Sequence, residues 1–250
     1  MIVGGVLLLV LAVIFSFIAR ANAGKLQALN AVDTYDTATL SAIHRRITTA
    51  LGANDFAQPC EVMGVIECAT PLTGPVSGQA LVAYLYTTHR EYEERITTQE
   101  SGRSTTRIER RSEQLEQNER RVPFTIRDDS GQVLVVADGA QIDLIETANR
   151  FVETTQPWTD ATRTLGQRQF ERGLEVGTRV FVSGTAIDQN GQVVIARHPT
   201  NSKQPFIISR KSEHELANSA ATWARNMRYA AIASGVIGLA LVIGGVLMGG

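Results

Sequence analysis

The chain has few cysteines and no excess of either charge. Of its 250 residues only 2 are Cys, and 24 basic side chains are balanced by 25 acidic ones. So few cysteines exclude a disulfide-dense scaffold, and a net charge of −1 argues against a nucleic-acid-binding protein that neutralises phosphates. Cys60 and Cys68 lie in a predicted strand, where eight residues span about 26 Å and a disulfide tolerates roughly 4.4–6.8 Å. We therefore expect reduced thiols, as in a cytoplasmic compartment.

Charge is also missing from both ends of the chain, since every charged side chain lies between Arg20 and Arg228. As helices, residues 2–19 and 230–250 would rise about 27 Å and about 31 Å, close to the roughly 30 Å of a bilayer's hydrocarbon core. We predict a transmembrane helix in each segment. A cleavable signal peptide is an alternative for the first, because residues 21–23 read Ala-Asn-Ala, a small-x-small cleavage pattern.

Basic residues beside the two apolar segments predict the orientation. Arg20 and Lys25 follow the first segment, and Arg225 and Arg228 precede the second, whereas the outer ends carry no Lys or Arg. Because Lys and Arg concentrate on the cytoplasmic side, we expect a multi-pass membrane protein with its middle domain in the cytoplasm and both termini across the membrane.

Residues 20–58 form a predicted juxtamembrane segment with one amphipathic helix. Asp36 or Thr37 can cap the helix, and Gly52 can end it. The apolar positions recur at intervals of three and four residues: Leu40, Ile43, Ile47 and Leu51. This pattern predicts one apolar face that packs on the domain or on the membrane surface.

Residues 59–211 are predicted to form a β-rich domain. Runs rich in β-branched and aromatic residues recur between turn residues, near 60–68, 80–88, 122–127, 132–137, 141–146, 179–187, 192–197 and 205–209. The predicted fold class is thus an α+β membrane protein, with a small barrel-like soluble domain between two terminal transmembrane helices.

Two turns within this domain share the pattern Asp-x-x-Gly-Gln-Val-x-Val/Ile. They occupy residues 128–135 and 188–195. The Asp can hydrogen-bond the turn backbone and the Gly can take a positive φ, so we expect two hairpins, each with a type I turn and a bulge. A calcium loop is excluded because neither copy supplies the alternating oxygens and distal Glu of an EF-hand.

Residues 90–121 differ in composition from the rest of the domain. Eight Arg and eight Glu occur among these 32 residues, with few apolar side chains. Such a segment cannot pack a core, and its balanced charge does not suit binding to an anionic polymer. We predict a solvated arm, either a hairpin tip or a helix, and the functional alternative is a docking arm for a partner protein.

A juxtamembrane helix over residues 212–229 is predicted to continue into the last apolar segment, because Ser212 and Glu215 form a capping box and no helix breaker follows. Small residues then recur every three or four positions at Ala231, Gly235, Gly238, Val242, Gly245 and Gly249. Such a stripe allows close helix contact in lipid. The candidate partners are the first helix, through Gly4 and Gly5, or a second copy of the chain.

Four segments, at residues 71–78, 122–128, 171–184 and 205–209, give the chain a family resemblance. In order and spacing they resemble the membrane-adjacent (BAM/GIDE) domain of GIDE-type membrane-anchored RING E3 ubiquitin ligases, which also occurs without the RING in prokaryotic membrane proteins. The resemblance picks out Pro71, Gly74, Pro75, Ser77, Gly78, Pro123, Phe124, Asp128, Gly131, Gly177, Gly184, Pro205, Phe206, Ile208 and Ser209 as family positions. It implies a domain that recruits targets or relays the state of the membrane.

The chain departs from these ligases in its zinc ligands. A RING needs eight Cys or His ligands for two zinc ions, and this sequence has two Cys and four His, with no C-x₂-C pair. No catalytic, metal or cofactor residue is predicted, and His44, His89, His198 and His214 receive no role. We predict a membrane-anchored interaction or scaffold module with an unknown protein partner. The alternatives are a ubiquitin-transfer component that works with a RING on another chain, and a self-associating membrane-organising protein.

Overall fold

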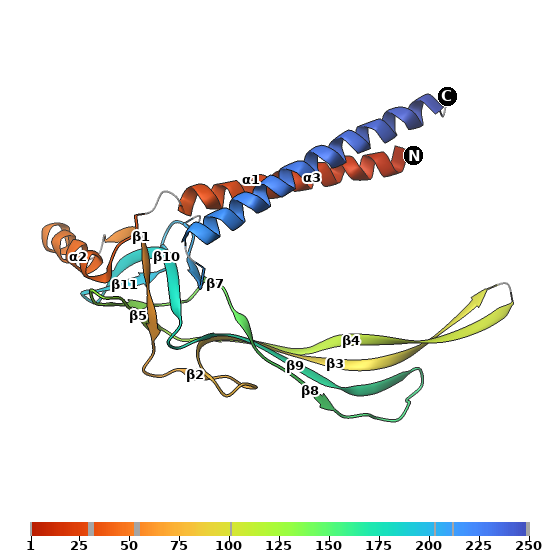
Figure 1. Ribbon diagram of the computed structural model, residues 1–250, viewed down its shortest axis with the longest axis horizontal. Coiled ribbons are helices and arrows are strands. Elements are labelled where there is room, and N and C mark those ends of the chain that lie inside the picture. Colours follow the sequence, from red (N-terminus) through yellow and green to blue (C-terminus); the bar gives the residue numbers. More distant parts are fainter. Residues whose placement is uncertain are drawn as a thin grey trace.

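The computed structural model describes residues 2–29, 33–52, 56–100, 102–202, 204–211 and 213–248. Figure 1 shows three parts: a barrel-like sheet, a long second sheet that projects from it, and a pair of long helices. The predicted β-rich, barrel-like domain is confirmed. Each part has a distinct sequence character, and together they position the candidate site.

The barrel is a closed five-stranded sheet. Its strands are β1 (Ala57–Glu67), β5 (Phe124–Arg127), β6 (Gln132–Val135), β11 (Gln192–Ala196) and β10 (Arg179–Gln189). Neighbours pair in that order, and the pairing of β1 with β10 closes the ring. The β6–β11 pair is parallel and the others are antiparallel. This is the strand order of an OB-type barrel. Beyond β10 the sheet extends through β12 (Ile207–Ser209) and β7 (Gln141–Ile142).

The barrel closes around alternating apolar residues, because side chains of a strand point to opposite faces. Val62, Ile126, Ile195 and Ile208 are fully buried members of one continuous core. Leu40, from a helix described below, belongs to the same core.

The second sheet is built from two long insertions between barrel strands. Its strands are β2 (Leu72–Thr73), β3 (Ala80–Glu100), β4 (Arg103–Arg121), β8 (Ile145–Glu153) and β9 (Thr162–Glu175). The order is β2-β3-β9-β8, and β4 pairs with the free side of β3. The β3–β4 hairpin reaches farther from the barrel than any other strand (Figure 1).

The structure corrects several expectations for this region. The predicted strand at 80–88 is the start of the 21-residue β3. Of the two forms predicted for residues 90–121, the hairpin is confirmed and the helix is wrong. Strands β8 and β9 were not predicted as separate strands. The reason is that polar or charged residues occur on both faces of these strands, so they lack the apolar alternation from which a half-buried strand is recognised.

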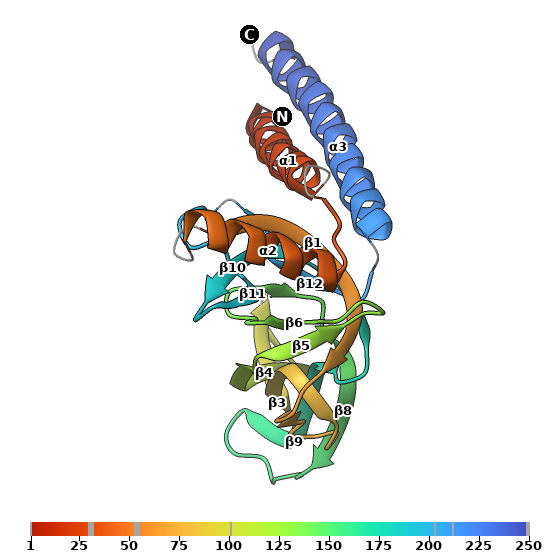
Figure 2. The same ribbon diagram turned by 90° about the vertical axis from the view of Figure 1, so that its left-hand side faces the viewer.

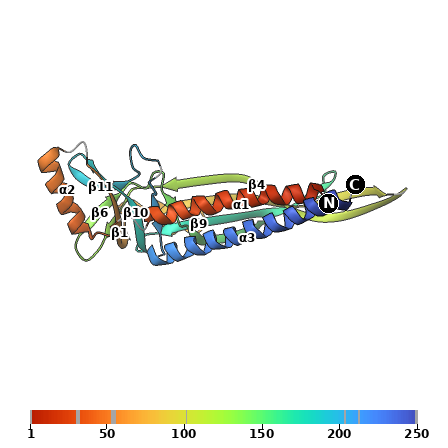
Figure 3. The same cartoon turned by 90° about the horizontal axis from the view of Figure 1, so that it is seen from above.

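Helices α1 (Ile2–Leu29) and α3 (Glu213–Met248) pack side by side and antiparallel, with both chain termini at the end away from the barrel (Figures 1 and 3). Helix α1 is longer than the predicted 2–19. Among the described residues, one stretch is long and apolar enough to cross a membrane, Arg225–Gly245 with mean hydropathy 1.7, and Val3–Ile18 is a shorter apolar helix. Ser212 and Gly249 lie outside the described residues.

Helix α2 (Thr37–Leu51) lies over β6 and β11 at one end of the barrel (Figure 2). It begins after Asp36, whose side chain accepts a hydrogen bond from the Thr39 N–H at 2.6 Å. It ends at Gly52, whose φ of +91° few other residues tolerate. The apolar face of α2 therefore packs on the domain.

Candidate functional site: the α2 clamp, the motif loop and the charged arm

The two repeated turns lie next to each other beneath α2. Strands β6 and β11 pair in parallel, with Leu134 opposite Val194 and Val135 opposite Ile195. These pairs are equivalent positions of the two copies. The turns that precede β6 and β11 therefore lie at the same end of the barrel, and they carry Asp128 and Asp188. The structure thus brings to one helix two aspartates that are far apart in the sequence, and we call the contacts of Asp128 and Asp188 with α2 the α2 clamp.

The first aspartate holds the beginning of α2. Asp128 accepts hydrogen bonds from the Thr37 N–H at 2.7 Å and the Thr37 hydroxyl at 2.8 Å, and from the backbone N–H of Ser130 and Gly131. Partial burial raises the pKa of Asp128, but these donors outweigh it and hold the pKa well below its usual range. A Cβ on Gly131 would lie 3.0 Å from the Thr37 hydroxyl, so a larger residue here would crowd the contact with α2.

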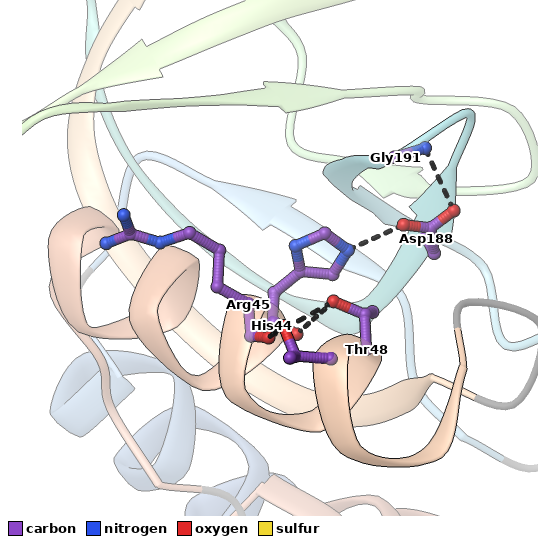
Figure 4. Close-up of polar contacts among 6 residues, drawn as sticks. His44, Arg45, Thr48, Asp188 and Gly191 are labelled. Atoms are coloured by element: carbon purple, nitrogen blue, oxygen red, sulfur yellow. Dashed lines mark hydrogen bonds and ion pairs between the residues drawn. The ribbon is translucent and has the colours of Figure 1, made fainter.

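The second aspartate holds the middle of α2 (Figure 4). The His44 Nε2 lies 2.6 Å from Asp188 Oδ2, and the side chains are 6% and 9% exposed. Since a carboxylate only accepts, Nε2 donates this hydrogen bond. The Gly191 N–H donates to the other carboxylate oxygen at 3.1 Å. Hydrogen bonding by His44 and then by Gly191 lowers the pKa of Asp188.

Sequence reasoning gave His44 no role, although a signal was present. His44 is four residues after Leu40 and three before Ile47, so it lies on the apolar face of α2. It is buried, and its ring meets Phe56 edge-on at 5.0 Å. A histidine on an apolar helix face requires a buried partner, and Asp188 of the repeat supplies it.

The turns themselves differ from the predicted type I turn with a bulge. In the second copy Asn190 and Gly191 both have positive φ, at 56° and 81°, which is the geometry of a two-residue type I′ turn. In the first copy, Arg127 pairs with Gln132 across a four-residue loop, and Gly131 is not among the positive-φ glycines. The shared pattern therefore reflects the Asp and the strand that follows, not a common turn.

The first family segment, residues 71–78, which we call the motif loop, folds around a buried carboxylate that sequence reasoning did not select. Glu171 of β9 is fully buried and accepts from the backbone N–H of Val76 at 2.7 Å and of Ser77 at 3.2 Å. The hydroxyls of Ser77 and Thr147 donate to its other oxygen at 2.5 and 2.7 Å. Burial raises the pKa of Glu171, yet the four donors lower it below its usual value.

This arrangement is a structural anchor. A Cβ on Gly74 would lie 2.4 Å from the Ser77 hydroxyl and 2.7 Å from Glu171, so only glycine fits there. The N–H of Gly78, with φ of +71°, closes the loop onto the Gly74 carbonyl at 2.9 Å. The Ser77 hydroxyl donates to the carboxylate and contacts no described histidine, so it is not an activated nucleophile. Within the described residues, no three His, Cys, Asp or Glu side chains gather as a metal site.

The third and fourth family segments meet in the barrel wall. A Cβ on Gly184 would lie 2.9 Å from the Ile195 side chain and 3.0 Å from the Phe206 ring, so the glycine makes room for both. Phe124 and Ile208 are core residues, and the buried Ser209 hydroxyl donates to Asp143 at 3.3 Å.

The remaining family positions shape the chain at turns. Gly177, with φ of +84°, donates its N–H to the Ile66 carbonyl at 2.9 Å between β9 and β10. Pro71, Pro75 and Pro123 are exposed, and Pro205 is partly buried.

The charges of the arm are neutralised within the sheet. Glu93 of β3 contacts Arg163 of β9 at 2.5 Å and Arg110 of β4 at 3.8 Å. Glu94 and Glu109, which face each other across β3 and β4, are bridged by Arg111 at 2.8 and 3.1 Å. The guanidinium of Arg95 lies 3.9 Å from the centre of the Trp158 ring. The arm therefore presents a mixed, balanced surface.

The stripe of small residues on α3 faces α1. A Cβ on Gly5 would lie 2.7 Å from the Gly238 carbonyl and from the Val242 side chain, whereas Gly4 has open space around it. A Cβ on Gly235 would lie 3.8 Å from the Ala12 methyl group, which is an ordinary van der Waals contact. Ala231 is buried, and Gly245 is partly buried. The contact at Gly5 is thus made within the chain, so this face is not free for a second copy.

Comparison with known proteins adds one finding. The model of a protein family described as GIDE, E3 ubiquitin ligase, matches residues 93–244, from within β3 to within α3. No curated protein and no solved structure gives a significant match. The matched region covers the outer part of the arm, most of the barrel and the apolar helix.

Proposed function

The chain belongs to the GIDE family, and we propose that it is a membrane-anchored protein-interaction module whose docking element is the arm, residues 90–121 of strands β3 and β4. A RING holds two zinc ions with eight Cys or His ligands. The 250 residues contain two Cys and four His. We therefore assign to this chain the docking role of a ligase-related protein and not the transfer of ubiquitin.

One observation carries the docking role. The last β3–β9 pair is Glu94 with Thr162, but β3 and β4 continue as a two-stranded ribbon for six more pairs, from Arg95–Ile108 to Glu100–Arg103. At about 3.4 Å per residue the ribbon projects about 20 Å. An isolated two-stranded ribbon is marginally stable in water. Past Arg95, which still contacts Trp158, the ribbon pairs only with itself among the described residues, so it is suited to be completed by a partner.

The chemistry of the arm indicates a protein partner. Its Arg side chains are matched by Glu, so an anionic polymer would find little net attraction. Ile108 and Leu115 are 58% and 51% exposed. They place one apolar side chain at the base of the two-stranded ribbon and one in the part of β4 nearer the barrel. Balanced charge around a few apolar contacts gives specificity and register to a protein–protein contact.

The test removes the ribbon and keeps the sheet. Residues 95–108 are replaced with Asn-Gly, which joins the cross-strand partners Glu94 and Glu109 by a two-residue turn. The full chain, the shortened chain and an Ile108→Ser variant are purified from native membranes with cross-linking. We expect a protein that is captured by the full chain, weakened by Ile108→Ser and lost from the shortened chain. Recovery of the chain alone, or equal capture by all three, would refute the docking role.

The same proposal places α1 and α3 across a bilayer with the barrel in the cytoplasm. Support comes from the apolar stretch Arg225–Gly245, the pairing of α1 with α3, and the basic residues at their barrel ends. A reporter fused after Gly250 should be active only outside the cytoplasm. Cytoplasmic activity of that reporter would refute this orientation.

The arm sets a condition on insertion, because the arm and the helix pair leave the barrel toward the same side in Figure 1. A charged side chain in hydrocarbon costs about 2.5–3.5 kcal/mol or more. The arm must therefore stay outside the bilayer, and we infer that the barrel turns relative to the helix pair when α3 inserts. In a Cys68→Ser background, Cys introduced at the exposed Ser104 should react with a membrane-impermeant maleimide in proteoliposomes. Protection of this Cys by lipid would refute the inference.

The family description favours a second candidate, a component that presents targets to a RING on another chain. In that case a RING protein and ubiquitin conjugates should be captured with the full chain and lost with the arm. Capture of a partner from a cell that has no ubiquitin would exclude this role and leave the docking role in place.

A further inference from the structure

Helices α1 and α3 form a groove at their barrel end that contains two arginines. Its lining consists of Ser16 and Arg20 from α1, and Arg228, Ala231 and Ile232 from α3. Both arginines are exposed, and among the described residues neither has an acidic partner. In the second sheet, by contrast, arginines such as Arg111 of β4 and Arg163 of β9 form ion pairs with glutamates. The groove therefore presents two positively charged hydrogen-bond donors, and its described lining contains no negatively charged acceptor.

The groove lies at the depth of lipid headgroups if α3 spans a bilayer. Arg228 is three residues, about 4.5 Å, inside the beginning of the apolar stretch Arg225–Gly245. Arg20 is two residues beyond the end of the apolar helix Val3–Ile18. Tyr229, beside Arg228, is 65% exposed, and Tyr and Trp concentrate at this level of a membrane.

From this placement we propose that the groove binds the phosphate of an anionic phospholipid in the leaflet that faces the barrel. Two guanidinium groups can each donate paired hydrogen bonds to phosphate oxygens, and the phosphate relieves their mutual repulsion near a medium of low dielectric constant. Ile232, which is 63% exposed, is four residues after Arg228 and thus farther into the apolar stretch, where it can pack against an acyl chain. Basic pockets between membrane helices bind headgroups in this way.

The inference rests on the proposed membrane insertion, and the test separates the two. Trp158 and Trp223, which are all the tryptophans of the chain, are replaced with Phe, and Ile232→Trp places a reporter in the groove. The full chain is reconstituted in phosphatidylcholine vesicles that contain a minor fraction of brominated phosphatidylcholine or brominated phosphatidylglycerol. Bromine quenches the reporter when the brominated lipid occupies the groove.

We expect stronger quenching by brominated phosphatidylglycerol, with a preference of about fivefold for each arginine. Arg20→Gln with Arg228→Gln should reduce the preference to about one. The control is Arg45→Gln with Arg46→Gln, which removes the same charge from the exposed face of α2 and should leave the preference unchanged. Equal quenching by the two lipids in the parent chain, or equal loss in both double variants, would overturn the lipid site.

Two further outcomes distinguish the alternatives. If neither brominated lipid quenches the reporter, α3 is not inserted and the proposed membrane topology fails together with the site. If inorganic phosphate removes the preference more than chloride of the same ionic strength does, the groove binds a free phosphate ion, and the lipid assignment is wrong. An unchanged preference in phosphate supports the lipid headgroup.

Discussion

Glu171 offers the sharpest test of how the family segments are held together. In Glu171→Ala four donors lose their acceptor: the N–H groups of Val76 and Ser77 and the hydroxyls of Ser77 and Thr147. The hydroxyls can rotate toward other acceptors, but the two backbone N–H groups cannot. A fully buried unsatisfied group costs about 1–3 kcal/mol, so two such groups set an upper range of about 2–6 kcal/mol for the loss in the free energy of unfolding. Val76 and Ser77 are partly buried, so we expect a value in the lower half of this range. The whole free energy of unfolding of a domain is only about 5–15 kcal/mol, so this loss is severe.

Glu171→Gln should cost much less, because the shape and most hydrogen bonds survive. The Gln oxygen can accept from the two N–H groups, and its NH₂ group can donate to the two hydroxyls, which also accept. Only the charge of the acceptor is lost, which we expect to cost about 1–2 kcal/mol. The order of stability should be wild type, then Gln, then Ala. Glu175→Gln, in the same strand at a partly exposed position, is the matched control and should have little effect.

The pH dependence gives a second signature. The pKa of Glu171 is lower in the folded protein than its ordinary value, so the unfolded chain binds the proton first as the pH falls. Its stabilising contribution is therefore present above the ordinary Glu pKa of about 4.3 and is lost as the pH falls through the lower folded pKa. Glu171→Gln has no proton to bind, so its stability should fall less than that of the wild type over this range.

The assay is urea unfolding of the full chain in mild detergent. Trp223→Phe leaves Trp158, in the loop between β8 and β9, as the sole tryptophan. Hydrogen exchange of the peptide over residues 71–79 adds a local measurement, since the amides of Val76 and Ser77 should exchange fastest in the Ala variant. Equal losses for Ala and Gln, or the same acid sensitivity in wild type and Gln, would show that Glu171 does not organise this loop.

Three further predictions concern other contacts. Asp128→Ala should speed hydrogen exchange at the start of α2, and Asp129→Ala, beside it but exposed, should not; equal rates would refute the clamp. Gly5→Leu should separate α1 from α3, because its Cβ meets α3 at 2.7 Å, whereas Gly4→Leu points into open space; cross-linking between the helices measures this, and equal yields would contradict the packing. Burial raises the pKa of Cys60 to about 12, so a maleimide should label this thiol only after unfolding; labelling of the folded chain at pH 8 would show that the barrel opens there.

The repeated turns show how a pattern can be read correctly as local structure and still conceal its use. Each copy was expected to be a hairpin, and each is one. The sequence pattern does not reveal that β6 and β11 are neighbours, because parallel pairing depends on how the whole barrel closes. Only that closure places Asp128 and Asp188 at the same end of the barrel, where one helix can bind the first through Thr37 and the second through His44.

The Glu171 anchor was hidden for a similar reason. In the sequence Glu171 is one glutamate among many in strongly charged strands, and the Pro and Gly residues of the motif loop indicate only a turn. Its donors come from the loop at residues 76–77 and from Thr147, which are about 95 and 24 positions away. A buried carboxylate is stable only where several donors converge, and convergence over such separations is a property of the folded chain.

The sequence by itself determined the features that depend on local pattern. These are the amphipathic helix between Asp36 and Gly52, the β-rich barrel strands, the charged arm, the long apolar helix after residue 212, and the family to which the chain belongs. The tertiary structure alone decided how these parts meet: α2 on the two aspartates, the motif loop on Glu171, and Gly5 against Gly238. Periodicity and composition act over a few residues, whereas buried polar contacts and close helix packing require segments that only the complete fold brings together.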